Sequence, residues 1–211
     1  MSASSGGSVS LESLNGLPAE LAGQRLLACC SSPRWAAEVA SGRPYASVDE
    51  VLARSDESVA GLTQADLEQA LAGHPRIGDP SQAGAAGGAE AGPGAAAGVP
   101  RQEAPAGAGW SGREQAGVRA AGQATLRALA AGNQAYEERF GHIYLVCATG
   151  RSGTELLTLL RERLGNDPGT EWEVVRRELG KINQIRLRKL LEGTGELEGP
   201  RAPRRGAGDT G

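Results

Sequence analysis

A stretch of glycine and alanine divides the sequence into two parts that can bury apolar side chains. Nineteen of the 29 residues from 81 to 109 are Gly or Ala, and three more are Pro. A segment of this composition has almost nothing large to bury, which predicts a flexible Gly/Ala-rich insert. The core must therefore come from residues 11–80 and from the sequence that resumes at Trp110.

Helical periodicity dominates both parts. Apolar residues from Trp172 to Leu190 recur every three or four positions, which predicts an amphipathic helix over 170–191. A Ser or Thr three residues before an acidic residue, typical of a helix start, occurs at Ser47/Glu50, Thr63/Asp66 and Thr170/Glu173. Only the run HIYLVCA at 142–148 has the residue types of a strand.

This pattern predicts an all-α fold, a single-domain helical bundle over residues 11–192. Strands and helices do not alternate, and no internal repeat is present. Aromatic residues make up only 3% of the chain, so the predicted core is aliphatic and rich in alanine. Residues 1–10 are rich in Ser and Gly, residues 193–211 are rich in Gly, Pro and Arg, and both are predicted to be disordered tails.

Charge and cysteine usage exclude several classes of protein. The net charge of −3 and the scattered basic residues give no indication of a nucleic-acid interface. The three cysteines, Cys29, Cys30 and Cys147, form no CxxC pair, which argues against a disulfide framework or a zinc site. No signal peptide, membrane span or peroxisomal address is evident, so we expect a cytoplasmic protein without membrane contact.

His74 is a candidate general acid or base. It lies in the sequence GHPRIG after a predicted helix, where Gly73 ends the helix and Pro75 stiffens the chain. Imidazole titrates near neutral pH, and a stiff loop gives it a fixed position. The spacing alone favours a plainer alternative, in which the histidine stabilises a helix C-terminus.

A second group of polar residues, SGREQ at 111–115, lies beyond the insert. Ser111 and Glu114 have the spacing of a capping box, which is the structural alternative. As a site, Glu114 would charge-match a histidine, and Gln115 would hydrogen-bond a polar ligand.

Arg151 follows the apolar run and precedes a predicted helix. Its guanidinium could clamp a carboxylate or ureido oxygen, or it could simply lie at the surface. His142, the only other histidine, lies within the apolar run and is interpreted as a packed core residue.

Taken together, these motifs resemble the family of 2-oxo-4-hydroxy-4-carboxy-5-ureidoimidazoline (OHCU) decarboxylases, enzymes of urate degradation. The resemblance lies in HPRIG at 74–78, SGREQ at 111–115, NQAYEERFGHIYLVCATGRS at 133–152, and the segments 14–45 and 181–191. Members convert OHCU to (S)-allantoin, share an all-helical fold and are generally homodimers. The resemblance therefore implies that HIYLVCA is helical despite its strand-like composition.

The resemblance also implies roles for individual residues. It makes His74 and Glu114 catalytic, and it makes the following positions substrate-binding: Pro75, Ser111, Gln115, Arg151, and backbone groups of residues 143–146 such as those of Ile143 and Leu145. Because the C=N bond of OHCU can accept the electrons released with CO2, the expected reaction needs no cofactor or metal. The partner is a small-molecule substrate, and we expect a homodimer.

Two alternatives keep the fold but change the function. In one, the chain is a helical binding or scaffold module whose polar motifs merely end and begin helices. In the other, the same fold acts on a related ureido-imidazolone. Three polar motifs at junctions of loops and helices favour the enzyme, since a scaffold does not need them.

Overall fold

The computed structural model describes residues 10–78 and 122–192, and within these ranges it contains eight helices and no strand. The all-α prediction is confirmed. The helices are α1 (Leu11–Gly16), α2 (Ala19–Leu27), α3 (Pro33–Ser41), α4 (Val48–Ala60), α5 (Gln64–Ala72), α8 (Gln123–Phe140), α9 (Gly153–Arg163) and α10 (Pro168–Glu192). The predicted insert and tails lie outside the described residues, except Ser10, whose side chain caps α1.

Two of the predicted helix starts are confirmed by their caps. The Ser47 hydroxyl accepts the Glu50 amide at the start of α4. At the start of α5, Thr63 and Asp66 form a reciprocal capping box. These bonds satisfy backbone N–H groups that lack a partner inside the helix.

The predicted start of α10 is wrong by two residues. The helix begins at Pro168, and Thr170 lies inside its first turn. The cap is Asp167, whose carboxylate accepts the Thr170 amide at 3.0 Å and the Thr170 hydroxyl at 2.6 Å. An aspartate followed by proline is a strong helix start, because proline at the first helical position loses no hydrogen bond.

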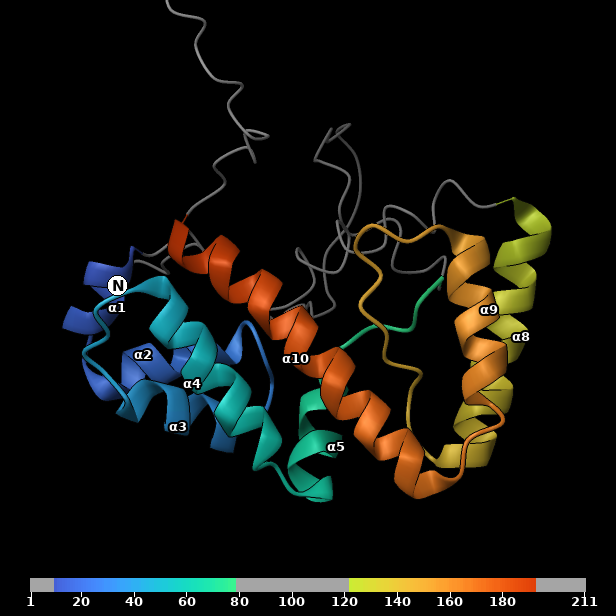
Figure 1. The fold of residues 1–211 in the computed structure, drawn as a ribbon, viewed down its shortest axis with the longest axis horizontal. Coiled ribbons are helices and arrows are strands. Elements are labelled where there is room, and N and C mark those ends of the chain that lie inside the picture. Colours follow the sequence, from blue (N-terminus) through green and yellow to red (C-terminus); the bar gives the residue numbers. More distant parts are fainter. Residues whose placement is uncertain (1–9, 79–121, 193–211) are drawn as a thin grey trace, which may run out of the picture.

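Helix α10 passes between two groups of helices (Figure 1). On one side it packs with α1–α5 around a large apolar cluster that includes Trp35, Leu67 and Leu179. On the other side α8 and α9 lie side by side and form a second cluster with Leu129, Leu160 and other residues. Among the described residues, no helix is long and apolar enough to span a membrane.

The run HIYLVCA is neither helix nor strand, so the helix implied by the family resemblance is wrong here. Its residues 143–148, the extended segment, run between the two apolar clusters (Figure 1). Side chains pack into the two clusters alternately: Ile143, Leu145 and Cys147 in the first, and Tyr144, Val146 and Ala148 in the second. This period of two is that of extended backbone, and burial on both sides explains the continuous apolar sequence.

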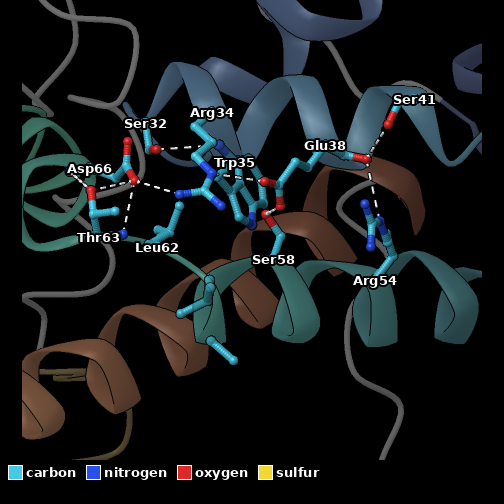
Figure 2. Close-up of polar contacts among 12 residues, drawn as sticks. Ser32, Arg34, Trp35, Glu38, Ser41, Arg54, Ser58, Leu62, Thr63 and Asp66 are labelled. Carbon is cyan, nitrogen blue, oxygen red and sulfur yellow. Dashed lines mark hydrogen bonds and ion pairs between the residues drawn. The ribbon is translucent and has the colours of Figure 1, made fainter.

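A polar network joins α3, α4 and α5 (Figure 2). Arg34 donates to Glu38 at 2.9 Å and to Asp66 at 3.1 Å, and Ser58 donates to Glu38 at 2.7 Å. Hydrogen bonds from Ser58 and Arg34 lower the pKa of Glu38. The network fixes the start of α5 against α3, and the other end of α5 carries His74.

Candidate functional site

His74 directly follows α5, and its ring is fixed in one tautomer. The Nδ1 atom lies 3.0 Å from the carbonyl oxygen of Ala70, and the His74 amide donates to Leu71 at 2.9 Å. A carbonyl oxygen can only accept, so Nδ1 carries the hydrogen and Nε2 is the basic nitrogen of the neutral ring. The Ala70 carbonyl therefore selects the tautomer of the neutral ring.

The loop after His74 is fastened to α8. Arg76 makes a bidentate ion pair with Glu137, at 2.6 and 2.7 Å, and Asn133 donates to the Ile77 carbonyl at 2.7 Å. The guanidinium lowers the pKa of Glu137. A cavity of about 580 Å³ lies beside this loop and is lined by Arg76, Gly78, Ala130, Asn133, Gln134, Glu137 and Glu138. The half-buried Pro75 is therefore part of a firmly held loop.

The α2–α3 connection leaves no room for a side chain at Gly73. A Cβ atom there would lie 1.9 Å from the Ser31 hydroxyl oxygen and 2.8 Å from its Cβ. We expect Gly73→Ala to cost about 1–3 kcal/mol of stability through overpacking and to displace His74. Urea unfolding and activity assays would measure both effects.

Gly61→Ala is the matched control, because Gly61 ends α4 with similar backbone angles and its nearest neighbour would be 3.6 Å away. The double variant Ser31→Gly/Gly73→Ala should recover most of the loss. Equal stability of the Gly61 and Gly73 variants would contradict the steric explanation.

Neither of the two cavities described in residues 10–78 and 122–192 is lined by both Arg151 and His74. Arg151 is half-buried and lines a cavity of about 750 Å³ between the extended segment, α4 and α10, together with Cys147 and Thr149. Neither His74 nor Pro75 is among the described residues that line it. The predicted site residues Ser111, Glu114 and Gln115 lie outside the described part of the chain.

The extended segment is held along one edge by charged side chains. Arg163 of α9 donates to the Leu145 carbonyl at 2.6 Å, and Glu178 of α10 accepts the Cys147 amide at 2.9 Å. By contrast, the backbone N–H and C=O of Val146 have no hydrogen-bond partner among the described residues. Because buried backbone groups are nearly always paired, this edge is suited to a ligand that offers complementary N–H and C=O groups.

His142 is packed as the sequence analysis interpreted it. Its ring lies 4.2 Å from that of Trp172 and 5.4 Å from that of Tyr136, measured between centroids. Nδ1 donates to the Ile143 carbonyl at 3.1 Å. Burial lowers the pKa of His142, because the charged ring would lose its solvation.

This lowered pKa predicts a pH dependence of stability. Below about pH 6.5 the unfolded chain takes up a proton at His142 while the folded chain resists it, so acid weakens the fold down to the lowered pKa. We expect His142→Phe, which keeps the aromatic contacts, to flatten this part of the curve. Urea unfolding of both proteins between about pH 8 and pH 5 would test this prediction. If the free energy of unfolding depends on pH equally in the variant and the wild type, other groups cause the effect.

Two buried polar residues of α10 were missed by the sequence analysis. Asn183 and Arg186 are almost fully buried, and Arg186 donates to the Cys29 carbonyl at 2.9 Å. Both lie near the Cys30 thiol. Burial raises the pKa of this thiol, and the two side chains oppose part of that rise. A signal was present: they follow Leu179 at four and seven residues, on the apolar face of the helix.

Comparison with known proteins agrees with this architecture. The family model for OHCU decarboxylase matches residues 15–188. The uric acid degradation bifunctional protein TTL of Arabidopsis thaliana is 28% identical over 164 residues, covering 77% of this chain and 45% of that protein. The 2-oxo-4-hydroxy-4-carboxy-5-ureidoimidazoline decarboxylase of Amia calva is 38% identical over 78 residues, covering 33% of this chain and 45% of that protein. The chain thus spans about half the length of these curated relatives.

Solved structures share the fold. A crystal structure of OHCU decarboxylase in the presence of (S)-allantoin superposes with a TM-score of 0.58 at 25% identity, covering 79% of this chain and 96% of that one. A crystal structure of (S)-allantoin synthase gives a TM-score of 0.57 at 15% identity, covering 87% of this chain and 54% of that one, which supports the fold alone. Because the family match extends from α1 to α10, the protein belongs to the OHCU decarboxylase family.

Proposed function

We propose that the chain decarboxylates OHCU to (S)-allantoin, with His74 as the residue that exchanges the proton. The observation that carries the proposal is the single tautomer of His74, held by the Ala70 carbonyl on a loop that Arg76 and Asn133 fasten to α8. A general acid or base needs a fixed position, and these bonds give the imidazole one.

The reaction itself is supported by the substrate's own electronics. The carboxylate leaves as CO2, and the electron pair of the broken C–C bond moves toward the adjacent C=N bond. His74 Nε2 would exchange a proton with the substrate hydroxyl or with the enediol-like intermediate. Protonation on one face gives a single enantiomer of allantoin. The protein's tasks are then orientation, proton transfer and shielding, and the proposal requires no cofactor or metal.

The remaining site residues divide into catalytic and binding roles. The proposed role of Glu114 is to orient His74 and to favour the charged form of its ring. Pro75, Ser111 and Gln115 remain proposed substrate-binding positions. Arg151 remains a predicted anchor for the ring carbonyl or the ureido group.

The extended segment supplies the proposed backbone contacts. The carbonyl of Leu145 already accepts from Arg163, and that of Ile143 from His142. We therefore place the contact at Val146, whose N–H and C=O can pair with the alternating C=O and N–H groups of a ureide. The proposal also includes the homodimeric state and cytoplasmic location expected from the sequence.

Fresh OHCU, generated from urate by urate oxidase and hydroxyisourate hydrolase, provides the test. The purified chain should accelerate formation of (S)-allantoin, followed by circular dichroism. Racemic allantoin at the spontaneous rate would contradict the proposal. Turnover of a related ureido-imidazolone without turnover of OHCU would replace the substrate and keep the site.

A further inference from the structure

Two buried charged side chains form hydrogen bonds to the backbone of the extended segment, as a neighbouring strand would do in a sheet. Arg163 binds the Leu145 carbonyl, and Glu178 binds the Cys147 amide. In extended backbone, alternate residues direct their polar groups to the same edge, so both bonds lie on one edge. Val146 lies between them and directs its N–H and C=O to the opposite edge.

Glu178 is well placed to hold this edge rigidly. Its side chain is only 7% exposed; one carboxylate oxygen accepts from Lys181 at 2.6 Å and the other accepts from Cys147 at 2.9 Å. The bonds from Lys181 and Cys147 lower the pKa of Glu178 against the opposing effect of burial, so the acceptor stays charged at neutral pH. A hydrogen bond to a charged acceptor is about twice as strong as one between neutral groups.

We propose that Glu178 is a positioning residue for the decarboxylation: by holding the Cys147 amide, it keeps the Val146 amide and carbonyl turned toward the substrate. The inference rests on the proposed function, because the orientation of Val146 affects turnover only if a ureide binds at that edge. Arg163 has a similar place, but it also bonds Glu171 in the core, which makes Glu178 the better residue to test.

The test compares three variants with the wild-type chain. Glu178→Gln keeps an oxygen that can accept the Cys147 amide, whereas Glu178→Leu has a similar size and no acceptor. Glu57→Gln removes a carboxylate from α4 that is 69% exposed and, among the described residues, pairs with Arg54 alone at 3.4 Å, so it controls for the loss of charge.

The kinetic expectation is a change in KM. The hydrogen bonds from Val146 would stabilise the bound substrate and the transition state equally. Their loss would therefore raise KM and leave kcat nearly unchanged. We expect Glu178→Leu to raise the KM for OHCU and the Kd for (S)-allantoin about tenfold with little change in kcat. Glu178→Gln should restore most of this loss, and Glu57→Gln should match the wild type. A role in stability alone would lower the melting temperature without moving KM.

Amide hydrogen exchange provides a measurement that does not depend on a folded leucine variant. In the wild-type chain the Cys147 amide should exchange slowly with or without ligand, whereas the Val146 amide should become protected only when (S)-allantoin is added. In Glu178→Gln, and in Glu178→Leu if it folds, exchange at Cys147 should be faster than in the wild type.

Each outcome decides the inference. The inference is supported if Glu178→Leu raises KM and speeds exchange of the Cys147 amide, and if Glu178→Gln has a KM close to that of the wild type. An unchanged KM despite faster exchange overturns it, as does a Val146 amide that allantoin leaves unprotected. A wild-type chain that neither decarboxylates OHCU nor binds allantoin overturns the proposed function, and this inference with it.

Discussion

Replacing His74 with asparagine is expected to lower the rate of OHCU decarboxylation by about 10²–10⁴-fold while the fold is retained. The asparagine amide can still donate to the Ala70 carbonyl in place of Nδ1, so the end of α5 keeps its hydrogen bond. What disappears is the titratable nitrogen, Nε2. Steady-state formation of (S)-allantoin, with thermal unfolding measured on the same sample, would separate chemistry from stability.

His142→Asn is the matched control, because the chain has only these two histidines. It removes an imidazole that packs against Trp172, so it should lower stability and leave the rate per folded molecule nearly unchanged. A His74→Asn variant that makes (S)-allantoin at the wild-type rate would remove His74 from the mechanism.

Glu171→Ala should produce the largest loss of stability, about 3–5 kcal/mol. The Glu171 carboxylate is fully buried at the start of α10 and accepts from Arg163 at 2.8 and 2.5 Å, from Asn166 at 2.7 Å, and from the Tyr136 hydroxyl. Removing it leaves the guanidinium buried without a compensating charge. Urea unfolding followed by circular dichroism would measure the difference in free energy.

An exposed ion pair on the same helix provides the comparison. Glu173 is 68% exposed and lies 3.6 Å from Arg176, so Glu173→Ala should cost less than about 1 kcal/mol. Replacing both partners of the buried pair, as Arg163→Met/Glu171→Leu, should recover part of the loss. Recovery should remain incomplete because the Leu145 carbonyl still loses its donor. Similar losses in the Glu171 and Glu173 variants would mean that the buried pair contributes little.

The helices were predictable because their signals are local. Caps at Ser47 and Thr63 and the apolar face of α10 depend on residues a few positions apart, and all three appear in the structure. The start of α10 was misplaced because two overlapping caps compete there, and Asp167 with Pro168 prevails over Thr170.

The extended segment and the site were harder to predict because they depend on distant residues. Burial between two clusters, which only the tertiary structure shows, decides that HIYLVCA is neither helix nor strand. The polar motifs predicted a histidine at the end of a helix but not its hydrogen-bond partner, the Ala70 carbonyl. The burial of Arg163 and Glu178 likewise follows from tertiary packing.

The alternation of the extended segment has a mechanical consequence for the whole molecule. Neighbouring side chains on one backbone are anchored in different apolar clusters, so neither cluster can loosen without pulling on the other. The two halves should therefore melt in a single transition. A small molecule bound along that backbone would therefore stabilise both halves at once.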